Sequence, residues 1–305
     1  MLSRRDLLHR ALPAIAASRM MAADASAQVR FAAISDIQYA DQENAGKRLY
    51  RESLVKLENI IGQLRNQSPD FVIHLGDLVD RGAENADRIM PLFSRLPRPQ
   101  YQVLGNHDFF GPRNNVLRRF GMKRPYYDFA RPGWRFIVLD GMYVSVKGGW
   151  PEESPQYLEG KKMLAELQER RAPNARDWNG AVGAEQRSWL RQTLEAASRR
   201  GERAIVCCHF PVLAAATTPA HLLWDHEEVL GILDAQPAVA AYLCGHDHNG
   251  GYAERNGIHH ITMKGVVEND VAECVRMVEL HSDRIELRKP GAKEGRVLAL
   301  ARRAG

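Results

Sequence analysis

The sequence of 305 residues has no uninterrupted apolar run of about 18 residues, the length that a helix needs to cross a bilayer. It also has no internal repeat and no cluster of basic residues, although its formal net charge is +5. We therefore expect no stable membrane span, and the scattered charge favours a solvated surface over a nucleic-acid-binding face. With 45% hydrophobic residues, the composition is typical of a globular protein with a substantial core, organised as one large domain or two small ones.

Cysteine is scarce, because the chain has four cysteines and none of them stands in a C-x-x-C pair. Cys207, Cys208 and Cys244 lie inside apolar, strand-like runs, where a thiol is usually buried. We expect buried free thiols rather than a disulfide framework, with a single disulfide bond as the alternative in an exported protein.

The amino-terminal segment has a composition of its own. Arg4 and Arg5 precede a short apolar stretch, and residues 25–27 read Ala-Ser-Ala, as at a cleavage site. Residues 1–27 resemble a twin-arginine export signal, which implies a periplasmic or otherwise exported protein. The alternative is a disordered basic tail on a cytoplasmic protein. In either case we expect the folded domain to occupy residues 28–305.

Strand-like and helix-like apolar patterns alternate through the middle of the chain. This alternation predicts an α/β fold, with antiparallel strands added near the carboxyl terminus. Asp225 and Glu228 resemble a capping box that opens one of the helices. The expected strands are residues 29–35, 71–75, 101–104, 134–140, 203–208, 239–244, 258–263, 274–280 and 284–288. The expected helices are residues 48–66, 85–96, 161–171, 183–201 and 226–235.

The connection between residues 141 and 183 is unusually long for a loop. It contains a polar helical pattern at residues 161–171. Such a segment can form a lid or wall over a site, or it can be a surface decoration, and the sequence leaves both interpretations open.

Polar side chains that can bind metals follow five of the expected strands, each at the point where the strand ends. In an open α/β sheet, the carboxyl ends of the strands meet at the edge where ligands bind. One such residue would carry little information. Five sets at the same edge are hard to explain as buried polar side chains that only make hydrogen bonds within the core. The candidate residues are Asp36, Asp77, Asn106, His107, Asp108, His209, His246, Asp247 and His248.

These side chains supply oxygen and nitrogen donors and no thiolate. Such a set suits Mn²⁺, Fe or Zn²⁺ better than a soft metal or Ca²⁺. The donors are too many for one tetrahedral ion, but they fit two ions that share a carboxylate, since neighbouring cations need an anionic bridge. Gln38 is unusual here, because a histidine would be the expected metal-binding partner two residues after Asp36.

Five short motifs stand in the order found in calcineurin-like metallophosphoesterases. They are D-x-Q (36–38), GD-x-x-D (76–80), GNHD (105–108), HFP beginning at His209, and GHDH (245–248). The resemblance implies a four-layer α/β/β/α sandwich that holds a dinuclear metal site.

The same resemblance implies roles for individual residues. One metal would be held by Asp36, Gln38, Asp77 and His248, and the other by the bridging Asp77 with Asn106, His209 and His246. His107 would act as the acid beside the leaving group, oriented by Asp108. Two metals lower the pKa of a bridging water, so that hydroxide can attack phosphorus in line near neutral pH.

A finer resemblance extends over nearly the whole chain after residue 30. Segments such as SDIQYAD (35–41), NGAVGAEQ (179–186) and GHDHNGGY (245–252) are similar to the manganese-dependent ADP-ribose/CDP-alcohol diphosphatase group. The resemblance implies two divalent ions, with Mn²⁺ foremost, and hydrolysis of the phosphoanhydride in ADP-ribose, CDP-alcohols or similar small nucleotides. The export-like amino terminus is a departure from this group, and it argues against intracellular ADP-ribose as the physiological substrate. A cyclic-nucleotide phosphodiesterase, a general phosphodiesterase or phosphomonoesterase, and a non-catalytic scaffold are the alternatives.

Several residues are candidates for contacts with the substrate. Asn179, Gly180 and Gly183 are expected in a flexible polar loop, and Arg113 is a candidate contact of the second phosphate. Candidate stacking partners for the base are Tyr39, Phe109, Phe110 and Trp178. The alternative for each aromatic residue is a core or anchoring role, and for Arg113 a place on the surface. The sequence does not indicate an oligomeric state.

Overall fold

The computed structural model describes residues 27–301. The expected export signal at residues 1–27 lies outside the described residues except for Ala27, so its role stays a prediction. Within residues 27–301, no helix has both the length and the apolar character needed to span a bilayer. The four cysteines are free and buried, as expected from their apolar surroundings.

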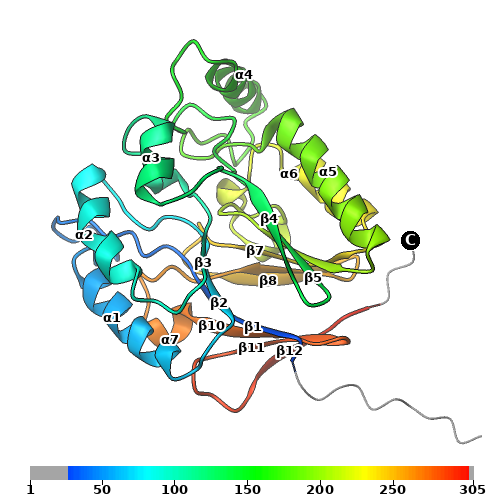
Figure 1. The fold of residues 1–305 in the computed structure, drawn as a ribbon. Helices are drawn as coiled ribbons and strands as arrows, with labels where there is room; N and C mark the ends of the chain where they lie inside the picture. The colour runs from blue at the N-terminus through cyan, green and yellow to red at the C-terminus, as the bar shows by residue number, and fades with distance from the viewer. Residues whose placement is uncertain (1–26, 302–305) are drawn as a thin grey trace, which may run out of the picture.

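Two six-stranded sheets form the centre of the described chain (Figure 1). In order across the sheet, the first consists of β12 (Gly295–Ala299), β11 (Arg284–Arg288), β10 (Arg276–Leu280), β1 (Val29–Ile34), β2 (Phe71–His74) and β3 (Gln100–Gln102). The second consists of β4 (Tyr127–Arg131), β5 (Trp134–Val138), β6 (Arg203–Cys207), β7 (Val239–Cys244), β9 (Ile258–Thr262) and β8 (Gly251–Arg255). Strands β1, β2 and β3 are parallel, and so are β5, β6, β7 and β9.

Helices cover the outer face of each sheet (Figure 1). The described helices are α1 (Glu52–Arg65), α2 (Ala83–Phe93), α3 (Arg113–Arg119), α4 (Pro155–Glu169), α5 (Gly183–Arg199), α6 (His226–Ala235) and the short α7 (Val271–Cys274). Of these, α4 does not lie on a sheet but packs on a separate cluster with Val144, Ala181 and Trp224. The first sheet carries α1 and α2, and the second carries α5 and α6.

Three hydrophobic clusters separate these layers. The cluster between the sheets joins Phe31 and Phe71 of the first sheet to Phe136 of the second. A second cluster packs the outer face of the first sheet on α1 and α2, and a third packs the second sheet on α5 and α6. Each layer therefore buries an apolar face against its neighbour, which confirms the predicted α/β/β/α sandwich.

The sequence patterns did not predict strands β4, β8 and β12. All three lie at sheet edges, and in β12 only Leu298 is buried. An edge strand buries few side chains, so its sequence lacks the apolar run that marks an inner strand. The helix predicted at residues 161–171 begins earlier, at Pro155, where the Ser154 hydroxyl accepts a hydrogen bond from the Tyr157 N–H group.

Asp225 precedes α6, but its side chain does not cap that helix. Its oxygens accept hydrogen bonds from the N–H groups of Val182 (3.2 Å) and Gly183 (3.0 Å) at the start of α5, and Arg187 forms an ion pair with it. The expected capping box with Glu228 is therefore wrong, because the buried carboxylate has its partners on the neighbouring helix. Asp225 ties α6 to the end of the 141–183 connection.

We predict that Asp225→Ala lowers the free energy of unfolding by about 3 kcal/mol, since it leaves buried N–H groups and the Arg187 guanidinium without their partner. Chemical denaturation of the full chain measures this change. The exposed Glu228 supplies the matched control, and Glu228→Ala should change stability by less than about 0.5 kcal/mol. An equal loss of unfolding free energy in the two variants would contradict the role of Asp225 as the acceptor at the start of α5.

Candidate metal centre

Residues from both sheets meet where the parallel strands end. In the first sheet, β1 leads to Asp36, β2 to Asp77 and β3 to Asn106. In the second sheet, β6 leads to His209 and β7 to His246. The five strand ends therefore converge as expected, but they come from two stacked sheets rather than from the edge of one.

Four residues of this region have a strained backbone. Asp36, Gln38, Asp77 and His246 have φ angles of 53°, 43°, 58° and 70°, in the left-handed region that non-glycine residues rarely enter. Such strain persists only where the surrounding structure enforces it, and it is concentrated at functional sites. Among these four residues, the Gln38 amide donates to the Asp77 carboxylate, and the His246 N–H group donates to the Asp36 carboxylate.

Two glycines permit close approach to the aspartates. A β-carbon at residue 105 would clash with the Asp77 carboxylate, and one at residue 245 would clash with the Asp36 carboxylate. Gly105 and Gly245 are therefore required by space rather than by a left-handed turn.

One group of donors surrounds His209. Its Nε2 atom lies 3.2 Å from Asp77 Oδ2 and 3.1 Å from His246 Nδ1. The donor atoms of Asp77, His209 and His246 all lie within 4.8 Å of one another, close enough to bind one ion together. Asn106 begins the short 3-10 helix Asn106–Asp108 that follows β3, and its amide oxygen is buried.

A second group of donors surrounds Asp36. Its Oδ1 atom lies 3.3 Å from His248 Nε2. The Gln38 Nε2 atom lies 3.3 Å from the same histidine nitrogen and 2.9 Å from Asp77 Oδ2. Asp77 therefore contacts both groups, which is the position that a bridging carboxylate needs.

Each of the three histidines is oriented by an oxygen on its other ring nitrogen. His209 Nδ1 lies 2.8 Å from the Leu75 carbonyl oxygen, and His246 Nε2 lies 3.0 Å from Asn179 Oδ1. His248 Nδ1 lies 2.9 Å from Glu268 Oε1. This arrangement is typical of metal-binding histidines, because it fixes the ring and leaves the second nitrogen as the donor.

The two aspartates dominate the electrostatics of the centre. Burial alone would raise the pKa of Asp77, but the nearby His209 and His107 hold that pKa well below its usual range. Burial alone would lower the pKa of His209, but Asp77 and Asp36 raise it to about 9. The centre therefore stabilises positive charge despite its burial, which is the condition for binding cations.

Two buried amide oxygens support coordination of metal. Gln38 Oε1 and Asn106 Oδ1 have no hydrogen-bond partner within the described residues, and an unpaired buried acceptor is costly unless a cation satisfies it. Asn106 fits this role as placed. The Gln38 amide fits after a half-turn, because its Nε2 atom faces Asp77 and His248 here. With carboxylate, amide and imidazole donors, the residues fit two divalent ions such as Mn²⁺.

His107 is oriented by Asp80, not by Asp108. Its Nδ1 atom lies 2.9 Å from Asp80 Oδ1, and its side chain is 25% exposed, which leaves Nε2 available to a ligand. Asp80 is the last residue of the GD-x-x-D motif, so the sequence did offer it as a candidate acid beside His107. Glu268, which orients His248, lies outside the five short motifs, so those motifs did not point to it.

Asp108 has a structural role in this arrangement. Its two oxygens accept hydrogen bonds from the backbone N–H groups of Asp77 (2.9 Å), Leu78 (2.8 Å), Val79 (3.3 Å) and Gly105 (2.9 Å). The expectation that Asp108 orients His107 is therefore wrong, because its acceptor capacity is used by the loop that carries Asp77.

Two expected substrate contacts are buried elsewhere. Tyr39 is 1% exposed and packs in the core beneath α1 and α2, so it cannot stack on a base. Arg113 is 3% exposed, forms an ion pair with Asp140 and donates to the Gly148 carbonyl oxygen at 2.7 Å. It therefore anchors the start of the 141–183 connection instead of reaching a phosphate. Phe109 is half-buried against the Arg113 guanidinium.

The loop at residues 179–183, which was expected to be flexible, is buried and held by hydrogen bonds. Asn179 Nδ2 donates to the Ala220 carbonyl oxygen at 2.8 Å, while its Oδ1 atom orients His246. Gly180 packs against the Gly141 backbone, and the N–H group of Gly183 is used by Asp225. These three residues therefore support the centre and are not exposed to a substrate.

Trp178 is the predicted aromatic residue that does reach the centre. Its ring is half-buried and lies 5.1 Å from the His246 ring and 5.3 Å from the His221 ring. Phe110, in contrast, packs near Phe120 in the cluster beside α1 and α2.

The fold and this centre define a class of protein. A model of the family described as calcineurin-like phosphoesterase matches residues 29–250, and the chain belongs to that family. Among solved structures, a dimetal phosphatase from Danio rerio matches with a TM-score of 0.81 and 27% identity, over 90% of this chain and 100% of that chain.

Two relatives carry names that are more specific than the family description. The chain is 32% identical to the manganese-dependent ADP-ribose/CDP-alcohol diphosphatase of Oryza sativa subsp. japonica, over 78% of this chain and 83% of that protein. It is also 32% identical to the protein of the same name from Arabidopsis thaliana, over 78% of this chain and 86% of the relative. These matches confirm the predicted family and the prediction of a metal-dependent phosphohydrolase.

We predict that His107→Ala retains its metal but lowers kcat by about 10²- to 10⁴-fold, the contribution of a well-placed general acid. Metal content, kcat and thermal unfolding are measured on the same preparations. Asp108→Ala should instead lower the unfolding temperature, because four backbone N–H groups lose their acceptor. Normal turnover by His107→Ala would exclude the assigned role.

We also predict that Gln38→His shifts the metal preference from Mn²⁺ toward Fe or Zn²⁺, because imidazole is a softer donor than an amide oxygen. Activity is measured after chelation and refilling with each metal, together with bound metal. Gln168→His is the matched control, since Gln168 is exposed on α4. An unchanged Mn²⁺ dependence in Gln38→His would count against a ligand role for this residue.

Proposed function

We propose that the protein hydrolyses the phosphoanhydride of ADP-ribose, CDP-alcohols or similar nucleoside diphosphate derivatives. The observation that carries the proposal is the convergence of the Asp36 and His209 donor groups on the shared carboxylate of Asp77. This dinuclear arrangement stands in a chain whose relatives are named for ADP-ribose and CDP-alcohol hydrolysis. Water is consumed, and a nucleoside monophosphate and a phosphorylated sugar or alcohol are released.

Each of the two donor groups would hold one ion. Asp36, Gln38 and His248 would hold one ion, and Asn106, His209 and His246 the other, with Asp77 between them. When bound, two divalent cations supply a water of lowered pKa and neutralise charge on the phosphoryl oxygens. The protein contributes rigid placement, since the other nitrogen of each histidine is already held by an oxygen.

His107 has the geometry of the proton donor. Because Asp80 holds Nδ1 at 2.9 Å, the partly exposed Nε2 is the nitrogen that reaches a substrate. Burial alone would lower the pKa of His107, but Asp77 and Asp80 raise it above its usual value. This shift is toward the imidazolium form, which can pass a proton to the leaving phosphate oxygen as the P–O bond breaks.

Trp178 and His221 form the side of the centre that suits a nucleoside. Both rings are partly exposed and both contact the His246 ring, at 5.1 Å in each case. Aromatic faces at this distance from a metal ligand offer a stacking surface for a base whose phosphates lie on the ions.

The substrate assignment predicts that ADP-ribose and CDP-choline are cleaved with Mn²⁺, with kcat/KM at least about tenfold above that for 2′,3′-cAMP or p-nitrophenyl phosphate. Chromatography of the products should show AMP and ribose phosphate from ADP-ribose. Asp77→Asn is the inactive control, because the variant loses the bridging charge. A preference for 2′,3′-cAMP or p-nitrophenyl phosphate would replace the proposed function with a phosphodiesterase or phosphomonoesterase.

A further inference from the structure

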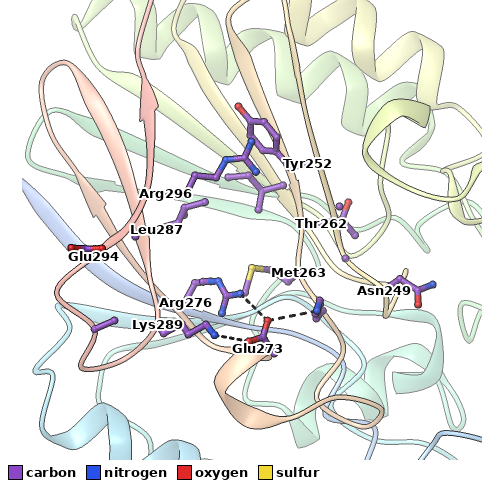
Figure 2. A pocket seen from close by; sticks show the side chains of 16 residues that line it. Asn249, Tyr252, Thr262, Met263, Glu273, Arg276, Leu287, Lys289, Glu294 and Arg296 are labelled. Carbon is purple, nitrogen blue, oxygen red and sulfur yellow. Dashed lines mark hydrogen bonds and ion pairs between the residues drawn. The ribbon is translucent and has the colours of Figure 1, made fainter.

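A cavity of about 560 Å³ opens at the side of the sandwich (Figure 2). It lies between strands β8 and β9 of the second sheet and strands β10, β11 and β12 of the first. None of its lining residues belongs to the candidate metal centre. The volume lies within the range of small-molecule sites.

Positive charge exceeds negative charge around this cavity. Its charged lining consists of Lys264, Arg276, Lys289 and Arg296 against Glu273 and Glu294, an excess of two positive charges. Such an excess around a concave surface favours an anionic ligand.

Three of the cations share a single carboxylate. Glu273 lies 2.5 Å from Lys289 Nζ, 3.6 Å from Lys264 Nζ and 4.0 Å from Arg276 Nη2 (Figure 2). Lys264 Nζ and Arg276 Nη2 lie beyond hydrogen-bonding distance of Glu273, so both can donate to a further anion. The side chains of this group are 22–50% exposed, and ion pairs at such positions exchange partners at little cost.

The rest of the cavity offers apolar and planar surfaces. Ile261, Met263 and Leu287 line it, and all three belong to the hydrophobic cluster between the sheets. Toward β12, the Arg296 guanidinium lies 3.3 Å above the ring of Tyr252 (Figure 2). A stacked guanidinium is a surface on which aromatic bases pack.

We propose that this cavity binds a phosphomonoester that carries an apolar or planar body. A phosphomonoester dianion has three terminal oxygens, which match Lys264, Arg276 and Lys289 better than the two oxygens of Glu273 do. The body of the ligand lies on Leu287 and on the Arg296–Tyr252 pair. A free nucleotide and the phosphate headgroup of a lipid share this chemistry.

Titration calorimetry on the full chain tests the proposal after the metals are removed with a chelator, so that binding at the candidate metal centre does not contribute. AMP and dihexanoyl phosphatidic acid are the two probes, and adenosine is the phosphate-free comparison. We expect saturable binding of at least one phosphate probe and none of adenosine. Tighter binding of AMP identifies a nucleotide site, and tighter binding of the lipid identifies a headgroup site.

Three variants make the test specific. Arg276→Ala/Lys289→Ala should weaken binding at least about tenfold, because the variant loses two of the three phosphate-facing cations. Glu273→Gln should strengthen binding about three- to tenfold, because the competing carboxylate loses its charge. Lys161→Ala/Lys162→Ala on α4 removes two charges elsewhere and should bind normally. No saturable binding, equal binding of adenosine, or equal affinity in all variants would overturn the proposal.

Discussion

The structure depends on two carboxylates buried on either side of His209. Asp36 and Asp77 are inaccessible to solvent, and their nearer oxygens lie 3.9 Å and 3.2 Å from His209 Nε2. Buried like charges repel strongly, so the fold is stable with both ionised only where positive charge lies between them. Without metal, His209 and His248 supply that charge, because the buried aspartates raise their pKa values, whereas the pKa of His246 is lowered. Bound cations would supply it instead of protonated histidines. The remaining architecture can be understood as the means of holding these groups together.

Holding them requires two sheets. A single sheet separates neighbouring strand ends by its strand spacing, whereas two stacked sheets bring ends from both sides to one point. Asp77 comes from the first sheet and His209 from the second, and they meet at 3.2 Å. Asp36, Asp77 and His246 have positive φ angles, because the backbone turns sharply after each of these strands. Such backbone conformations are strained.

The strand ends and the metal-binding residue types could be predicted from the sequence, since both follow from short local patterns. The choice between Asp80 and Asp108 as the partner of His107 could not be made, because both acids stand in the motifs and only the path of the loops separates them. The partner of His248 could not be predicted, because Glu268 lies outside the five motifs. Tyr39 and Arg113 failed as substrate contacts for a different reason: residue type indicates what a side chain can bind, but burial decides what it reaches.

Both ends of the 141–183 connection are held by contacts with the rest of the fold. Its first part is fixed by the buried Arg113, and its last part is fixed by the backbone hydrogen bonds between Val144 and Ala181. Asn179 then holds His246, and Asp225 holds the residues that follow. A segment that orients a metal-binding histidine cannot swing away without loosening that histidine. Closure of the whole connection over the centre would therefore break the contacts that hold its ends and His246.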